Sequence, residues 1–239
     1  MPDNKIFFLI VAAGKGERLG SDLKKQYLPL DNLPVLCHTL FKFLNFKQPG
    51  EIILVIPADD IMYCKKNILE PLEIMTKSAK DIFLVPGGKE RQDSVQKGLD
   101  LIKTMSKNYE KDIVLIHDGV RPFVNNDLIE RCITGAGEKG ACVPGIKAID
   151  TVKEAHNDVV LKTLDRNCIY QIQTPQAFLL KIISEAMDHA QDKNFLGTDD
   201  ASLVEFLGLN VSIIKGLKYN VKITTTEDLD FAKAYFNSH

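Results

Sequence analysis

The amino-acid sequence predicts an α/β fold: a single Rossmann-like domain built on a mostly parallel, twisted sheet with helices on both faces. Short runs rich in Val, Ile, Leu and Phe recur along the first half of the chain, and such near-continuous apolar character is typical of strands buried on both faces. Longer amphipathic stretches of helical period separate these runs. Strands that alternate with helices indicate a parallel sheet connected by right-handed crossovers.

The expected elements follow in chain order. The strands are KIFFLIVA, EIILVIP, DIFLVPG and DIVLIHD, at residues 5–12, 51–57, 81–87 and 112–118. Helices are expected over VLCHTLFKFLNF (35–46) and RQDSVQKGLDLIKTM (91–105), because each places its apolar side chains on one face. In the last third we expect helices over 177–191 and 199–208, a strand over 210–216 and a final helix from about Glu227.

The alternation of strands and helices breaks after residue 145. AIDTVKEA (148–155) and VVLKTLDR (159–166) are extended-type segments joined by the polar HND, a pattern that predicts a β-hairpin. A two-stranded hairpin is only marginally stable in water unless it packs on another surface, and a second subunit is the simplest such surface. We therefore expect one domain over residues 1–239, with residues 146–170 as a protruding β-arm for dimerisation.

Charge and hydropathy restrict the class of protein. The formal net charge is −2, whereas nucleic-acid-binding proteins normally carry a basic excess, so we expect no nucleic-acid partner. No run approaches the ~20 apolar residues that span a bilayer, and the start of the chain lacks a signal-peptide pattern. We therefore expect a cytoplasmic protein without a membrane partner. The five cysteines are scattered without a CxxC pair, which argues against a disulfide framework or a zinc site.

The stretch VAAGKGERLG (11–20) directly follows the first strand and predicts a phosphate-binding turn. A dinucleotide fingerprint would need glycine where Leu19 stands, and the Walker pattern fails because Ser21 and Asp22 follow Gly20. A third possibility is a loop whose amides and own cations bind a triphosphate, which Arg18, Lys24 and Lys25 suit. A tight turn with solvated lysines remains the plain alternative, but the carboxyl end of a strand is where ligands bind in open α/β sheets.

Two further motifs follow strands that should end at the same sheet edge. In GGKERQDSV (87–95), Gly88 allows close backbone approach and Ser94 can cap a helix or bind a ligand. In HDGVRPF (117–123), Asp118 is a candidate Mg²⁺ ligand, and an Asp118–Arg121 pair that stabilises a turn is the equal alternative. His117 is expected to be structural.

The remaining polar candidates have weaker local signals. Thr151 and Arg166 lie on the expected arm, where a solvated side chain is the usual outcome. Thr174 lies in QTPQ, Thr198 precedes DDAS and could equally cap a helix, and Lys222 lies in an extended segment.

Together these motifs resemble the 2-C-methyl-D-erythritol 4-phosphate cytidylyltransferase family. AAGKGERLG, KKQYLPL, GGKERQDSV, HDGVRPFV, DTVK, LDRN, QTPQAF, TDDASLVE and NVKITTTEDL occur in the family's order over nearly the whole chain. The resemblance implies a nucleotidyltransferase that joins CTP to the sugar-alcohol phosphate methylerythritol 4-phosphate and releases pyrophosphate, in isoprenoid precursor synthesis. It also implies Mg²⁺ and a homodimer formed through the β-arm.

The family's residue roles transfer to matching positions. Arg18 and Lys25 would stabilise charge on the α-phosphate, and Arg166 and Lys222 would hold the acceptor phosphate. The residues around the nucleotide would be Ala12, Ala13, Gly14, Gly88, Ser94 and Asp118, the last also near the metal. Those around the acceptor would be Thr151, Arg121, Thr174 and Thr198. One position departs from the pattern: the family usually has Pro where this chain has Lys24.

Two alternatives are kept beside this hypothesis. A ribitol 5-phosphate cytidylyltransferase would share the fold and chemistry and differ in the acceptor. A non-catalytic nucleotide-binding protein is more remote, because all four candidate cations are present.

Overall fold

The computed structural model describes residues 4–14, 23–76 and 82–238. Its main sheet has eight strands in the order β10-β7-β11-β6-β1-β4-β5, with β12 paired to β7. The four strands expected in the first half are confirmed, and they pair in parallel with one another. They are β1 (Ile6–Val11), β4 (Glu51–Ile56), β5 (Ile82–Pro86) and β6 (Ile113–Asp118).

The second half of the chain completes the sheet with β7 (Ala141–Lys147), β10 (Tyr170–Ile172), β11 (Gln176–Leu179) and β12 (Ser212–Lys215). β11 lies antiparallel between β6 and β7, and β10 continues along the same edge of β7. The prediction of a helix from residue 177 was therefore wrong at its start. A short apolar run does not distinguish a strand from a helix, and here long-range pairing decides.

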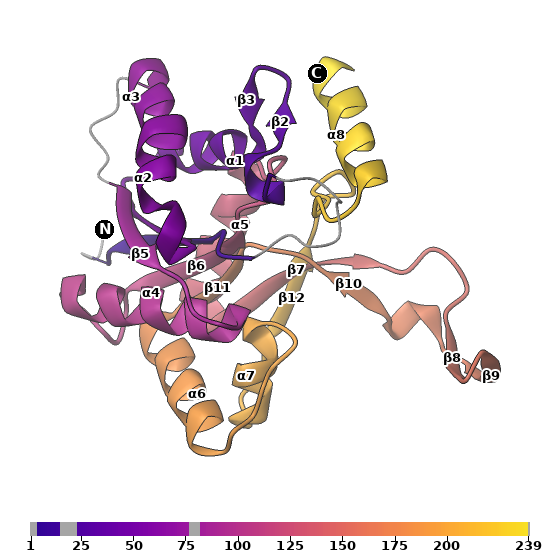
Figure 1. Cartoon of the computed structure of the whole chain (residues 1–239). Helices are drawn as coiled ribbons and strands as arrows, with labels where there is room; N and C mark the ends of the chain where they lie inside the picture. The colour runs from indigo at the N-terminus through magenta and orange to yellow at the C-terminus, as the bar shows by residue number, and fades with distance from the viewer. Residues whose placement is uncertain (1–3, 15–22, 77–81, 239) are drawn as a thin grey trace.

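Helices cover both faces of the sheet, as predicted (Figure 1). One face carries α1 (Val35–Leu44), α5 (Asn126–Lys139) and a three-part segment of α2 (Ile61–Cys64), a π-helical turn (Lys65–Leu69) and α3 (Glu70–Thr76). The other face carries α4 (Arg91–Met105), α6 (Leu180–Asp192) and α7 (Asp200–Phe206). A third cluster joins α8 (Thr226–Ser238) to the short hairpin of β2 (Pro29–Leu30) and β3 (Leu33–Pro34). None of the helices in the described ranges is long and apolar enough to cross a membrane.

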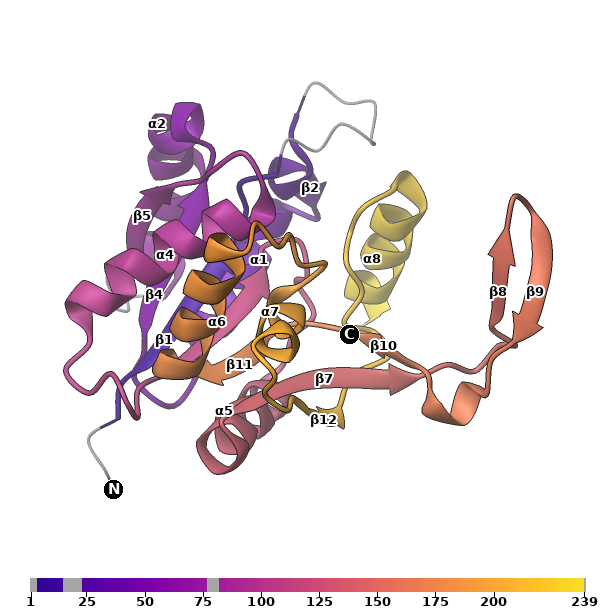
Figure 2. The same cartoon turned by 90° about the horizontal axis from the view of Figure 1, so that it is seen from below.

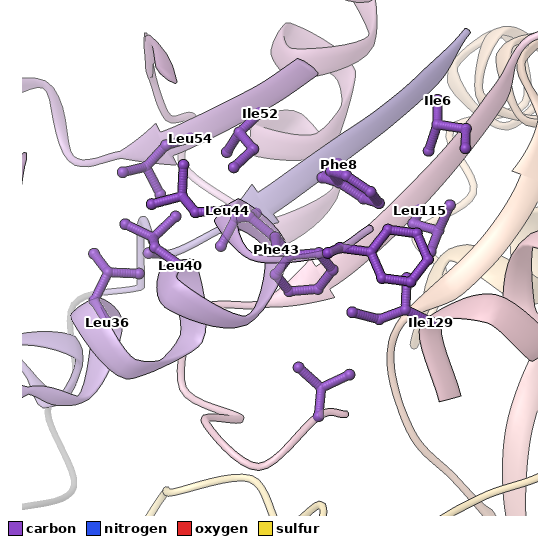
Figure 3. Close-up of a cluster of buried hydrophobic side chains, with 14 of the residues drawn as sticks. Ile6, Phe8, Leu36, Leu40, Phe43, Leu44, Ile52, Leu54, Leu115 and Ile129 are labelled. Atoms are coloured by element: carbon purple, nitrogen blue, oxygen red, sulfur yellow. The ribbon is translucent and has the colours of Figure 1, made fainter. Parts of the chain in front are cut away.

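Alternation along β1 builds the two layers of the core. Phe8 and Ile10 point to the face of α1, whereas Phe7 and Leu9 point to the face of α4. All four side chains are fully buried. Figure 3 shows the first layer, in which the Phe8 ring packs on Phe43 of α1 with centroids 5.1 Å apart. This packing fixes β1 at the centre of the sheet and so fixes the turn that follows it.

The expected hairpin is present as β8 (Lys153–His156) and β9 (Val159–Thr163). Asn157 and Asp158 occupy the two turn positions with φ of 47° and 62°, the left-handed pair that a tight hairpin turn of type I′ requires. Figures 1 and 2 both show the hairpin projecting away from the rest of the molecule. Every residue of β8 and β9 is exposed, including Val159, Val160 and Leu161.

Candidate functional site

The carboxyl ends of β1, β5 and β6 meet at one edge of the sheet, around a cavity of about 220 Å³. Ligands bind at this edge in open α/β sheets, where the strand order reverses about the first strand. The described lining consists of the following residues: Val11, Ala12, Ala13, Gly14, Lys25, Gln26, Gly88, Lys89, Glu90, Arg91, Ser94, Asp118, Val120 and Lys222. Eight of the sequence-predicted site residues are therefore brought together here.

Backbone hydrogen bonds tie the first turn to its neighbours. The Ala12 N–H donates to the Val55 carbonyl at 2.8 Å, and the Gly119 N–H donates to the Val11 carbonyl at 2.9 Å. A Cβ on Gly87 would lie 2.4 Å from the Cβ of Ala13, so the turn after β5 needs glycine to approach the turn after β1. The apolar floor of the cavity is thus held by the ends of four strands, β1, β4, β5 and β6.

Ser94 organises the turn from Gly88 into α4. Its Oγ accepts a hydrogen bond from the Gly88 N–H at 3.0 Å and donates to the Glu90 carbonyl at 3.1 Å. Glu90 is the N-cap of α4 and forms a reciprocal capping box with Asp93. The N-terminus of α4, the positive end of the helix dipole, therefore borders the cavity.

Asp118 is the electrostatic centre of the site. Its carboxylate lies 3.3 Å from Nε of Arg91, 3.2 Å from Nε of Arg121 and 3.1 Å from Nζ of Lys222. Burial alone would raise the pKa of Asp118, but the charges of Arg91, Lys222 and Arg121 outweigh burial and hold that pKa well below its usual range. Asp118 is consequently ionised at neutral pH.

A second layer of polar contacts fixes the backbone beneath Asp118. The Thr174 Oγ1 accepts a hydrogen bond from the Asp118 N–H at 3.1 Å and lies 2.9 Å from Nδ1 of His117. Nε2 of His117 donates to the Arg121 carbonyl at 3.1 Å, and Arg121 itself donates to the Asn220 carbonyl. Burial lowers the pKa of His117 to about 4, so the ring is neutral at pH 7. Thr174 and Arg121 thus support Asp118 from behind and are absent from the lining.

The two adjacent lysines that follow the glycine-rich turn, Lys24 and Lys25, have different contacts in the structure. Lys25 lines the cavity, and its Cε would be 3.8 Å from a Cβ on Gly14. Lys24 is absent from the lining, and its Nζ contacts Asp60 instead. Lys222 reaches the same cavity from near the other end of the chain, and it joins Lys25, Lys89 and Arg91 in the described lining. Arg18 lies outside the described residues.

The remaining predicted residues lie away from the cavity. Thr151 and Arg166 are exposed at the base of the arm, where Arg166 donates to the Ile149 carbonyl at 2.9 Å. Thr198 is exposed in the loop before α7. The alternative that Thr198 caps this helix was wrong, because Asp199 is the N-cap and its Oδ1 accepts the Ser202 N–H at 2.9 Å.

Arg91, which was not among the predicted site residues, links two motifs across the site. Its two terminal nitrogens donate to the two carboxylate oxygens of Asp200, both at 2.8 Å, while Nε faces Asp118. Asp200 is buried at the start of α7. The sequence shows Arg91 within GGKERQDSV and Asp200 within TDDAS, but the two residues are 109 positions apart. Their pairing depends on the fold and has no local signal in the sequence.

The carboxylates in the described lining of the cavity fit a Mg²⁺ ion that is bound together with substrate phosphates. Among the described residues, no cluster of three or more Asp, Glu, His or Cys side chains could form an all-protein metal cage. Mg²⁺ commonly binds through one or two carboxylates together with substrate phosphates, and Asp118 and Glu90 supply carboxylates in the lining. The residues therefore fit a magnesium ion that enters with a polyphosphate.

Comparisons with known proteins agree with this arrangement. The family model for 2-C-methyl-D-erythritol 4-phosphate cytidylyltransferase matches residues 6–238. A protein of that name from Syntrophus aciditrophicus is 44% identical over 233 residues, which cover 97% of this chain and 95% of that protein. The crystal structure of 4-diphosphocytidyl-2C-methyl-D-erythritol synthase from Anaerococcus prevotii is 34% identical, with a TM-score of 0.82 over 98% of this chain and 96% of that one. The cytidylyltransferase of Francisella tularensis is 30% identical, with a TM-score of 0.79 over 97% and 99% of the two chains.

Proposed function

The chain belongs to the 2-C-methyl-D-erythritol 4-phosphate cytidylyltransferase family, and from this premise we propose how its residues carry out the reaction. It is a nucleotidyltransferase that joins CTP and 2-C-methyl-D-erythritol 4-phosphate to give CDP-methylerythritol and pyrophosphate, a step of isoprenoid precursor synthesis. The observation that carries the mechanism is the convergence of Lys25 and Lys222 on the cavity beside Asp118.

The chemistry needs charge compensation more than proton transfer. The attacking group is a phosphate monoester, mostly dianionic at neutral pH because its second pKa is about 6. It must approach the α-phosphate of an anionic triphosphate, so cations and alignment lower the barrier. The site agrees with this requirement: His117 has both ring nitrogens engaged and is neutral, so it is not poised as a general base.

We assign the roles as follows. Lys25, together with Arg18, stabilises charge on the α-phosphate during attack, and Lys222 holds the acceptor phosphate in line with it. The cytosine and ribose lie on the turns that end β1 and β5. These turns contribute Ala12, Ala13, Gly14 and Gly88, and the first turn of α4 contributes Ser94.

Asp118 is the residue that we propose would hold Mg²⁺ together with the phosphates of CTP. When bound, the ion would neutralise charge on the triphosphate and on the departing pyrophosphate. Arg121 and Thr174 act on the reaction through Asp118, which both contact. Thr198 is retained as a candidate acceptor contact.

The arm provides the argument for a homodimer. Thr151 and Arg166 are exposed near the base of the hairpin and are absent from the cavity lining of their own chain. We propose that residues 146–170 pack on a second subunit, and that Thr151 and Arg166 complete its acceptor site. The functional unit would then be a cytoplasmic homodimer of two 239-residue nucleotidyltransferase domains.

The experiment is pyrophosphate release from CTP and Mg²⁺ with methylerythritol 4-phosphate, with ribitol 5-phosphate, or with no acceptor. We expect release only with methylerythritol 4-phosphate. Release only with ribitol 5-phosphate would keep the fold and mechanism but replace the acceptor. An absence of pyrophosphate release under all three conditions would contradict the proposed activity.

A further inference from the structure

A compact ionic cluster lies outside the cavity, just beside the segment that carries Lys25. Nζ of Lys24 is 2.7 Å from both carboxylate oxygens of Asp60, and Oδ2 of Asp60 also accepts the hydroxyl of Tyr27 at 3.0 Å. Asp60 ends the 3-10 helix Ala58–Asp60 that follows β4. From this geometry we propose that Lys24 and Asp60 are positioning residues that set Lys25 in the nucleotide cavity. The inference rests on the role proposed above for Lys25.

The cluster holds both sides of Lys25. Lys25 opens the 3-10 helix Lys25–Tyr27, so the two neighbours that contact Asp60 flank it at one residue before and two residues after. The Tyr27 N–H also donates to the Lys24 carbonyl at 2.8 Å, which closes the turn. One carboxylate, in the 3-10 helix that follows β4, therefore restrains the short segment from which Lys25 projects.

Tyr27 connects this restraint to the hydrophobic core. Its side chain is buried, and its ring packs on Tyr63 with centroids 4.7 Å apart. Burial and the neighbouring Asp60 both raise the pKa of Tyr27, so the hydroxyl keeps the proton that it donates. The Asp60 side chain is only 15% exposed, and such a mostly buried carboxylate with two donors is a firmer anchor than a fully exposed ion pair.

The backbone of Lys24 explains why an anchor is needed. Lys24 has φ of −64° and ψ of 143°, a polyproline-type conformation. A lysine samples many other backbone conformations, whereas proline is locked near this φ value. The ion pair with Asp60 thus selects one conformation at the residue before Lys25. Since a displacement of about 1 Å in a catalytic group can cost 10²-fold in rate, a small loss of order here should affect turnover.

The proposal is tested with single variants Lys24→Ala, Asp60→Asn and Lys24→Pro, and with the double variant Lys24→Ala/Asp60→Asn. Turnover with CTP and methylerythritol 4-phosphate, CTP affinity by calorimetry and thermal unfolding are measured for each. We expect about tenfold lower kcat for Lys24→Ala and for Asp60→Asn, with CTP affinity changed less than about twofold, and no additional loss in the double variant. Lys24→Pro should recover most of the activity, because proline imposes the same φ without any charge.

Matched controls separate this proposal from its rivals. Lys47→Ala removes another lysine from an ion pair, Lys47–Glu130 at 2.9 Å on the surface, and should leave kcat unchanged. Lys24→Pro as inactive as Lys24→Ala, with normal thermal unfolding, would show that Lys24 acts through its charge and would overturn the proposal. Unchanged kcat in Asp60→Asn would overturn it also. Lys25→Ala is measured alongside: if that variant is fully active, the proposed role of Lys25 fails, whereas an inactive Lys25→Ala with an active Asp60→Asn defeats the positioning proposal alone.

Discussion

Replacing Asp118 with Asn removes the carboxylate charge that Arg91, Arg121 and Lys222 share. The substitution keeps the size of the side chain and leaves the three cations in place. It therefore tests whether a buried charge network, and not shape alone, holds the site together.

The expected loss in the free energy of unfolding follows from the contacts that each of the three cations retains in Asp118→Asn. Arg91 retains its two bonds to Asp200, and the Lys222 side chain is 38% exposed and can turn to water. Arg121 is 11% exposed and loses the carboxylate that it contacts. Leaving one buried charge without its partner costs about 3 kcal/mol in the free energy of unfolding, which corresponds to a melting temperature about 6–12 °C lower for a domain of this size.

Urea denaturation and thermal melting of wild type and Asp118→Asn provide the assay. Because the folded-state pKa of Asp118 is lowered, its contribution is present above the unfolded pKa of about 4 and is lost as pH falls below that value. The stability gap between the two proteins should therefore narrow below about pH 4. An equally stable variant, or a gap that stays constant into acid, would refute the charge network. Turnover should fall at least 10²-fold, because Asn offers neither the charge nor the metal-binding carboxylate.

Three further predictions concern the core of the site, its turns and the arm. Burial lowers the pKa of His117 from its ordinary 6.5 to about 4, so the free energy of unfolding should fall by about 3 kcal/mol between pH 6.5 and pH 4. This free energy, measured by urea denaturation at several pH values, should depend on pH more steeply in wild type than in His117→Asn, and an equal dependence would contradict the assignment. Gly87→Ala should destabilise the protein by about 1–3 kcal/mol and weaken CTP binding, because its Cβ would lie 2.4 Å from that of Ala13, whereas Gly137→Ala, which meets nothing closer than 3.8 Å, should be neutral or stabilising in the same melting assay. Val160→Glu, at a side chain that is 56% exposed on the arm, should convert the proposed dimer to monomer in sedimentation experiments without lowering the melting temperature of the monomer; an unchanged dimer would place the interface elsewhere.

The sequence was sufficient for the parts of the fold that depend on local pattern. Period and apolar continuity located the first four strands and the helix over 91–105, because burial on both faces leaves a clear signal. The hairpin was found from a different local pattern, a polar turn between two extended segments. Long-range pairing has no such local signal, so residues 177–179 of the strand Gln176–Leu179 were assigned to a helix.

The same distinction applies to the site. Residues in the turns after β1, β5 and β6 were predicted, because strand ends collect at one sheet edge whatever the details of packing. The pair of Asp118 with Arg121 was one of two predicted alternatives and is present. The contacts of Asp118 with Arg91 and Lys222 were not predicted, since these residues approach it from elements far apart in the chain. Lys24 illustrates the limit most clearly: beside Lys25 in sequence it has the same chemistry, and only its contact with Asp60 in the fold distinguishes the two.

The central claim is that cations in the cavity act on the transition state of phosphoryl transfer and not merely on CTP binding. Lys25→Ala tests it most directly, with kcat and CTP affinity measured on the same preparation. We predict that kcat falls at least 10²-fold while CTP affinity falls only a few-fold, because the charge on the α-phosphate grows during attack. Equal losses in kcat and in CTP affinity would contradict the account and leave Lys25 as a simple nucleotide-binding residue.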